Sequence, residues 1–283
     1  MNDGLFTRLE RSLMSADTSS FSLAKSLRLA SVALVNPLEC YDRFRTIWQV
    51  RRQGAPHTAD YAWQDPAQGL RILESAASID IQAHLREPEL SQLEIEIQRR
   101  FNQFGEDRPF RAVHNGDPRL AQTCYAIARG LRPTLAVETG VCYGVTSSHL
   151  LQAMQQNGLG HLHSIDLPPL AKHADQYVGA LIPNSLRSRW TLHRGNSQRL
   201  LAPLLRQLGT IDFFLHDSLH THEHMKLEFT AAWAALRPGG LLMSDDIEGN
   251  RAFLELAARP DVRVAVVMKF SEGDALFGVA VKD

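Results

Sequence analysis

Three acidic residues stand at the ends of two short apolar runs in the C-terminal half of the chain. Asp217 follows the run 211–216, and Asp245 and Asp246 follow the run 241–244. If both runs are parallel strands, their carboxyl ends open into one crevice, where the three side chains converge. Carboxylates brought together repel one another unless a cation lies among them, and hard oxygen ligands suit Mg²⁺ or another divalent cation. The pattern predicts a divalent-metal site.

A second stretch with chemical potential is LAVETGVCYGVTSSHL, residues 135–150. Its apolar start ends in Glu138, as a buried parallel strand does when it reaches the carboxyl edge of a sheet. Gly140 and Gly144 then bracket a tight turn, and hydroxyls beginning at Thr146 stand in the first turn of a following helix. Only the outer glycines of a G-x-G-x-x-G fingerprint are present. This arrangement indicates a nucleotide-type cofactor site that is not built for a dinucleotide.

Asp166 ends the next apolar run, residues 161–166. An acid at the tip of the strand after a glycine turn is placed to accept hydrogen bonds from both hydroxyls of a ribose. The alternative is an ordinary aspartate that caps a turn.

The elements that must position these residues alternate between helix and strand from Asp117 onward, which is typical of a doubly wound parallel sheet. Proline, glycine and small-residue breaks separate them. The predicted helices span 118–129, 145–156, 171–182 and 225–236, with a turn at 237–240, and the predicted strands span 135–139, 161–166, 190–194, 211–216, 241–244, 262–268 and 275–281.

The E-x-G-x-x-x-G pattern from Glu138 to Gly144 resembles the first motif of class I S-adenosylmethionine-dependent methyltransferases. The acids at Asp217 and at Asp245-Asp246 resemble those of the divalent-metal-dependent O-methyltransferases of catechol, caffeoyl-coenzyme A and macrolide-sugar type, and the paired acids are most similar to the macrolide and cephalosporin-pathway members. The resemblance covers residues 117–283. It implies an α/β fold, a Rossmann-like seven-stranded sheet whose last pair is antiparallel.

The same resemblance implies an activity and a site. The activity is transfer of a methyl group from S-adenosylmethionine to a hydroxyl of a small-molecule acceptor such as a sugar, a phenol or a natural product, with Mg²⁺ or another divalent cation. The implied residues are Glu138, Gly140, Gly144 and Thr146 around the methionine portion, Asp166 on the ribose, Ser197 and Gln198 at the adenine, Asp217, Asp245 and Asp246 at the metal, and His220 as general base.

Other interpretations stay open. An NAD-dependent oxidoreductase shares the sheet and the ribose acid but needs the third glycine; a non-catalytic adenosylmethionine-binding module has no need of converging acids; and a metal-free methyltransferase would use His220 alone. The histidine-rich stretch 216–224 also raises a zinc site in which His220 and His224 share a helix face, although H-E-x-x-H spacing is absent. His216 is expected to pack under its strand, Glu223 and Glu228 to be exposed helix acids, and Asn250 and Arg251 to contact the acceptor or cap a helix.

The composition of the chain limits the kinds of binding partner and of cellular location that we expect. Thirty basic and thirty-one acidic residues give a formal net charge of −1, which offers no electrostatic case for binding nucleic acid or an anionic membrane surface. No run is long enough to span a bilayer, no secretory signal is expected, and three scattered cysteines favour a reducing, cytoplasmic location. Residues 1–113 show helical periodicity and are predicted to be a cap or an arm for homo-oligomerisation, and residues 114–283 the methyltransferase domain.

Overall fold

The computed structural model describes residues 23–53, 58–105, 108–110 and 116–283. The chain divides into two compact units, Met1–Ala55 and Pro56–Asp283. In the first unit, helices α2 (Leu23–Val35) and α3 (Pro37–Gln53) are separated by Asn36, whose side-chain oxygen accepts a hydrogen bond from the Glu39 amide at 3.1 Å. Proline at the first position of α3 has no amide hydrogen to leave unpaired, so the sequence Asn-Pro ends one helix and begins the next.

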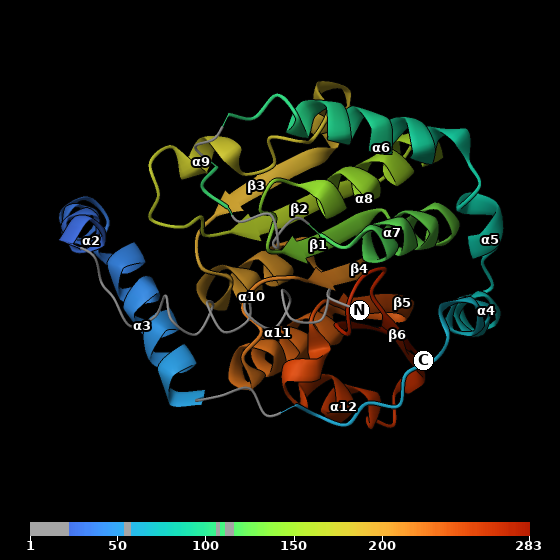
Figure 1. The fold of residues 1–283 in the computed structure, drawn as a ribbon. Helices are drawn as coiled ribbons and strands as arrows, with labels where there is room; N and C mark the ends of the chain where they lie inside the picture. Colours follow the sequence, from blue (N-terminus) through green and yellow to red (C-terminus); the bar gives the residue numbers. More distant parts are fainter. Residues whose placement is uncertain (1–22, 54–57, 106–107, 111–115) are drawn as a thin grey trace, which may run out of the picture. The chain divides into compact units, whose positions relative to one another are not determined.

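The second unit contains a seven-stranded sheet in the order β3-β2-β1-β4-β5-β7-β6 (Figure 1). The first five strands of this order pair in parallel, whereas β7 pairs antiparallel with both β5 and β6. The predicted fold class, including the antiparallel last pair, is therefore confirmed. The strands are β1 (Leu135–Thr139), β2 (His161–Asp166), β3 (Trp190–Arg194), β4 (Ile211–His216), β5 (Leu236–Ser244), β6 (Val262–Lys269) and β7 (Leu276–Lys282).

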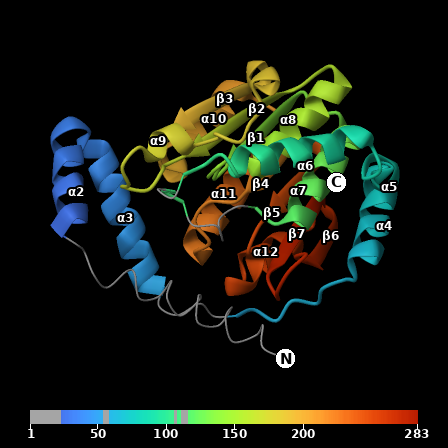
Figure 2. The same ribbon diagram turned by 45° about the horizontal axis from the view of Figure 1, so that its top comes forward.

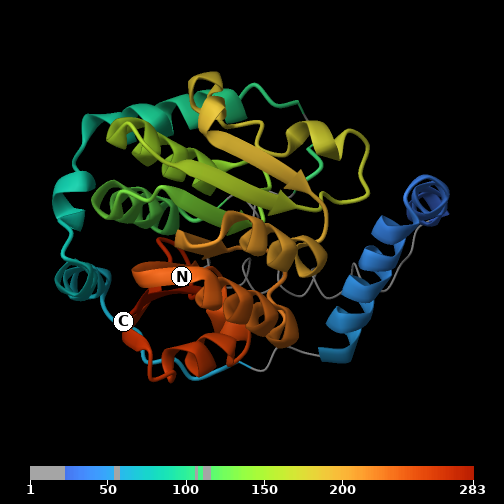
Figure 3. The same ribbon diagram turned by 180° about the vertical axis from the view of Figure 1, so that it is seen from behind.

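Helices cover both faces of this sheet, and each face has its own apolar core. One core joins Leu120 and Leu150 to the strand residue Phe213, and the other joins Leu201 and Trp233 to the opposite side of the same strands. Figure 2 shows the helices of the first face, and Figure 3 the helices of the second. The first face carries α4 (Pro66–Ala77), α5 (Ile81–His84), α6 (Pro88–Phe101), α7 (Pro118–Leu131) and α8 (Val145–Asn157), and the second α10 (Ser197–Leu208), α11 (His222–Ala235) and α12 (Ala252–Ala257).

The predicted helix over residues 171–182 is wrong. Only α9 (Ala174–Tyr177) is helical there, followed by a 3₁₀ turn, η2 (Asn184–Arg189). The amide groups of Gly179 and Leu181 instead donate to the carbonyls of Cys142 and Tyr143, at 3.0 and 2.9 Å. Gly179 has a φ of 66°, outside the helical region, so the segment packs against the glycine turn and does not continue α9.

The division of the chain into compact units does not coincide with the predicted boundary at residues 113/114. Helices α4 to α6 belong to the same compact unit as the sheet, because Leu73, Leu90 and Ile97 from these helices enter the first core. The predicted turn at 237–240 falls within the bounds of β5, which begins at Leu236, but it interrupts the pairing with β4 between Leu236 and Leu241, and Gly239 has a φ of 72°. Among the helices of the described chain, none combines the length and the apolarity needed to cross a membrane.

Candidate cofactor and metal site

The glycine turn after β1 lies against the turn after β4. Gly140 has a φ of 86°, and a Cβ atom on it would stand 1.7 Å from the backbone oxygen of Asp217. Gly144 has a φ of 89° and is the N-cap residue that precedes α8, and a Cβ atom there would stand 2.8 Å from the Cα of Gly179. Both glycines are therefore required by close backbone approach as well as by conformation.

The carboxylate of Asp166, at the end of β2, holds this glycine turn. Its Oδ2 accepts hydrogen bonds from the amides of Val141 and Cys142 at 2.7 and 3.0 Å. Burial raises the pKa of Asp166 above its usual value, although these two amides favour the charged form. The predicted ribose acid thus lies within contact of the predicted cofactor turn, and its second oxygen is not used by the turn.

Glu138 is fully buried one residue before the end of β1. Its Oε2 accepts from the hydroxyls of Ser147 and Ser164 at 2.6 and 2.7 Å, while within the described residues its Oε1 has no hydrogen-bond partner. Burial raises the pKa of Glu138 to about 8. A buried carboxyl that is neutral at pH 7 and has a free oxygen can serve a polar ligand group at the glycine turn.

Glu138 gives a pH prediction. The pKa of Glu138 is about 8 in the folded protein and 4.5 in the unfolded chain. The contribution of its neutral form to stability is therefore complete below pH 4.5 and is lost as the pH rises to about 8. Glu138→Gln mimics the neutral form. Between pH 5 and 8, we therefore expect the unfolding free energy of the variant to gain on that of the wild type by up to about 1.4 kcal/mol per pH unit. Urea denaturation at several pH values measures this difference, and parallel pH profiles would contradict the assignment.

The turn that joins β4 to α11, residues 217–221, is called the acidic turn here. One ligand atom from each of Asp217, His220 and Asp245 can be chosen so that all lie within 4.8 Å of one another. Burial, together with the charges of Asp246 and Asp166, raises the pKa of Asp217 to about 7. Burial and the charge of Asp217 likewise raise the pKa of Asp245 well above its usual range. A divalent cation between the two carboxylates would favour their charged forms.

Asp246 lies outside this group of three. It adopts a left-handed backbone conformation with a φ of 42°, and its side chain is 43% exposed. Its Oδ2 is 3.8 Å from His220 Nδ1, so it is an ion-pair partner for a charged His220. The structure therefore brings Asp217, Asp245 and His220 together at one edge of the sheet, and Asp246 is not a member of this group.

The residues predicted to contact the cofactor elsewhere lie at two helix starts. Ser197 and Gln198 open α10, where the side chain of Asn196 caps the helix by accepting from the Gln198 amide at 2.8 Å. Thr146 is buried in the first turn of α8, and a Cβ atom on Gly116 would stand 2.9 Å from its hydroxyl. Gly116 thus covers Thr146.

A buried polar cluster beneath the acidic turn differs from the prediction. Glu228 was expected to be an exposed helix acid and is instead fully buried, with its carboxylate between His216 and His224 at 2.6 and 2.7 Å. His216 is buried under β4 as predicted. His224 faces Glu228, so it does not share a face with His220, which precedes α11 and belongs to the acid group.

The sequence leaves the role of Asn250 open between contact with the acceptor and capping of a helix. Its side-chain oxygen accepts from the Ala252 amide at 2.9 Å and caps α12, and its Nδ2 donates to the carbonyl of His220 at 3.2 Å. The hydroxyl of Tyr61 donates to the Asn250 carbonyl at 2.9 Å. Asn250 therefore combines the predicted capping with a brace on the backbone of His220.

The residues at this edge fit the groups that the sequence implies. Glu138 Oε1 and Asp245 Oδ1 are both buried without a hydrogen-bond partner among the described residues. An unpartnered carboxylate oxygen beside a second acid and an imidazole nitrogen is a donor set for a divalent cation. The fit rests on orphaned polar atoms as well as on residue types.

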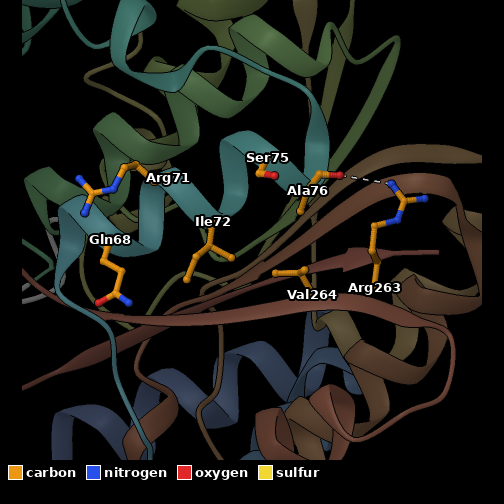
Figure 4. A pocket seen from close by; sticks show the side chains of 7 residues that line it. All are labelled: Gln68, Arg71, Ile72, Ser75, Ala76, Arg263 and Val264. Atoms are coloured by element: carbon orange, nitrogen blue, oxygen red, sulfur yellow. Dashed lines mark hydrogen bonds between the residues drawn. The ribbon is translucent and has the colours of Figure 1, made fainter.

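A separate hollow of about 410 Å³ lies between α4 and β6 (Figure 4). Its walls include Arg71 and Ile72 from α4 and Arg263 and Val264 from the start of β6. Strands β5 and β6 are both antiparallel to β7 and so run in the same direction. The hollow therefore lies at the amino edge of these strands, opposite the acids, and is not part of this site.

Residues 137–247 match a family described as a methyltransferase domain. The matched segment is similar to methyltransferase domains, and the sheet has the class I methyltransferase fold. The matched residues include the glycine turn, Asp166 and the acidic turn, and they end just beyond the acids that follow β5. Glu138 and Asp246, the first and the last acidic residues of the candidate site, therefore both lie within the matched segment.

Solved structures share the fold of this methyltransferase domain at low sequence identity. An O-methyltransferase from Bacillus cereus in complex with SAH has 19% identity over 68% of this chain and 91% of its own, with a TM-score of 0.53. The O-methyltransferase TomG from Streptomyces achromogenes, in complex with SAM, has 18% identity over 75% and 95%, with a TM-score of 0.50. The SAH-bound Podospora anserina methyltransferase PaMTH1 has 11% identity over 80% and 100%, with a TM-score of 0.50. No curated protein sequence matches the chain.

Proposed function

We propose that the protein is an S-adenosylmethionine-dependent O-methyltransferase that methylates a hydroxyl of a small molecule with the help of a divalent cation. The observation that carries the proposal is the convergence of Asp217, Asp245 and His220 next to a glycine turn. Two structural neighbours, the O-methyltransferases from Bacillus cereus and Streptomyces achromogenes, agree with it. An adenosylmethionine-binding module without catalysis would have no need of these converging groups.

When bound, S-adenosylmethionine supplies the methyl group and the cation lowers the pKa of the acceptor hydroxyl. The residues of the chain would do the rest. Asp217 and Asp245 would hold the cation, with Asp246 beside them, and the glycine turn, Asp166, Ser197 and Gln198 would orient the donor. A nitrogen of His220 would accept the hydroxyl proton while the acceptor oxygen forms its bond to the methyl carbon and the carbon–sulfur bond breaks.

His220→Ala is predicted to lower kcat by about 100-fold or more, because a positioned general base typically contributes this much. Cofactor affinity should change little, since His220 lies outside the glycine turn. The matched control is His222→Ala, which removes an imidazole two residues away that faces Glu255 at 2.8 Å and should leave kcat near the wild-type value. Labelled-methyl transfer to a panel of hydroxylated acceptors, with calorimetry of cofactor binding, makes the comparison.

One geometric observation favours a second role for the same residue. Because one nitrogen of His220 lies within 4.8 Å of a carboxylate oxygen of Asp217 and of one of Asp245, the imidazole could itself be a ligand of the cation. Calorimetry with Mn²⁺ separates the two roles. If His220 acts only as a base, the His220→Ala variant keeps its cation affinity and loses turnover. If His220 is a ligand of the cation, the variant loses both. Unimpaired transfer in the presence of a chelator would instead favour a metal-free methyltransferase.

Two expectations about the rest of the protein remain proposals. Residues 1–113, predicted as a helical cap or an arm for homo-oligomerisation, would shape access to the acceptor site or bring two copies together. The cytoplasmic location predicted from the cysteines agrees with Cys40, Cys124 and Cys142 all being free thiols.

A further inference from the structure

The carboxylate of Glu228, on α11, is hydrogen-bonded to several segments that meet at the candidate site. Its Oε2 accepts from Thr139 Oγ1 and His216 Nδ1, each at 2.6 Å, and its Oε1 accepts from Ser218 Oγ at 3.0 Å and His224 Nε2 at 2.7 Å. Thr139 ends β1, His216 ends β4, and Ser218 belongs to the acidic turn. One fully buried carboxylate thus joins the strand before the glycine turn to the turn that carries Asp217 and His220.

The charge of this carboxylate decides which atoms carry hydrogen. Burial alone would raise the pKa of Glu228, but the neighbouring imidazoles of His224 and His216 outweigh it and hold the pKa well below its usual range. An ionised carboxylate can only accept hydrogen bonds. His216 Nδ1 and His224 Nε2 are therefore donors, and each carries a hydrogen.

The N–H group of His224 faces three oxygens at once. Glu228 Oε1 is 2.7 Å from His224 Nε2, Ser197 Oγ is 3.0 Å away, and Ser218 Oγ is 3.1 Å away. One hydrogen cannot be donated fully to three acceptors, so the strength of each contact depends on the other two. Ser197 begins α10, on the proposed adenine side, whereas Ser218 lies in the acidic turn.

We propose that the shared N–H of His224, oriented by Glu228, couples cofactor binding at Ser197 to ordering of the acidic turn. When the adenine engages the Ser197 hydroxyl, the hydrogen of His224 is donated to Glu228 and Ser218, and the turn that carries Asp217 and His220 becomes fixed. Glu228 and His224 are then positioning residues. The coupling rests on the proposed function, because it takes Ser197 as an adenine contact. By linkage, an ordered acidic turn strengthens cofactor binding by the same factor.

Amide hydrogen exchange with and without S-adenosylhomocysteine, in the absence of divalent cations, tests the coupling. In the wild type we expect the ligand to slow exchange in peptides from the glycine turn and, by about fivefold or more, in peptides from the acidic turn. In Glu228→Gln, slowing at the glycine turn should remain and slowing at the acidic turn should be lost, since the amide nitrogen cannot accept the bonds that one carboxylate oxygen now accepts.

Two further variants complete the design. Ser218→Ala removes one of the three oxygens that compete for the hydrogen of His224, and it leaves no buried charge unpaired. It therefore replaces Glu228→Gln if that variant fails to fold. It should also abolish the effect of the ligand on exchange in the acidic turn. Glu223→Gln makes the same charge change at an exposed position of α11 and should behave like the wild type. A purely structural role would alter exchange equally with and without ligand, so the ratio between the two states is the readout.

The outcomes separate the two proposals. Ligand protection of the glycine turn in the wild type without any effect at the acidic turn overturns the coupling and leaves the proposed function standing. The coupling also falls if the acidic turn of Ser218→Ala and of any folded Glu228→Gln protein is protected as strongly as in the wild type. Absence of protection at the glycine turn itself overturns the proposed function and the coupling together.

Discussion

Asp245→Asn is expected to lower methyl transfer by about 100-fold or more while making the cation-free protein more stable. The loss follows from removing a buried ligand of the proposed cation. The gain follows because the carboxylates of Asp217 and Asp245 are buried together, which raises the pKa of both. An amide at position 245 removes this repulsion, and functional sites commonly give up stability in this way.

Thermal unfolding at pH 8 with a chelator measures the second effect, and we expect a rise of a few degrees. Added Mg²⁺ should raise the Tm of the wild type and leave that of Asp245→Asn unchanged. Asp274→Asn makes the same charge change at an exposed site, 86% accessible in the β6–β7 turn, and should affect neither activity nor cation dependence. A variant that transfers methyl groups at the wild-type rate would refute the cation-assisted reaction.

Gly140→Ala is expected to destabilise the fold by more than about 3 kcal/mol and to abolish cofactor binding. The new methyl group would overlap the backbone oxygen of Asp217, 1.7 Å from its ideal position, and backbone atoms cannot swing away as the end of a side chain can. A φ of 86° adds conformational strain. Relieving the overlap would separate the glycine turn from the acidic turn, so both halves of the site should be lost.

Gly158→Ala is the matched control for this substitution. Gly158 ends α8 with a φ of 69°, but a Cβ atom there has nothing within 4 Å. It should cost about 1 kcal/mol, the conformational part alone, and leave cofactor binding intact. Denaturant unfolding and calorimetry distinguish the pair, and equal effects at the two glycines would show that conformation alone, and not the contact with Asp217, is what position 140 requires.

Most of the sheet could be predicted from the sequence because its strands are short apolar runs bounded by turn residues. The limits of β2, β3 and β4 agree with the prediction to the residue. The prediction of a helix over residues 171–182 is wrong because local apolar periodicity does not show that the amides of Gly179 and Leu181 donate hydrogen bonds to the glycine turn. That contact exists only after folding. The strand β5 begins earlier than predicted because Leu236 already pairs with Ile211; the pairing is interrupted over residues 237–240, where Gly239 has a φ of 72°, and resumes at Leu241.

The positions of candidate site residues could be predicted where a strand end fixes them. The burial and the hydrogen-bond partners of a helix side chain could not. Asp166 ends β2 and Asp217 follows β4, and the order of the strands brings both to one edge of the sheet. Glu228 lies on a helix whose apolar pattern does not distinguish a buried acid from an exposed one, and only the positions of His216 and His224 explain its burial. Its spacing of four residues from His224 was the one signal in the sequence, and such pairs are common on exposed helix faces.

The strand order has a consequence for synthesis on the ribosome. The central strand β1 pairs with β2 on one side and with β4 on the other, so its second edge stays open until residue 216 has left the exit tunnel. A nascent chain halted before that point exposes an apolar strand edge, which invites aggregation. Truncations or translational pauses between residues 166 and 211 should therefore be the most dependent on chaperones.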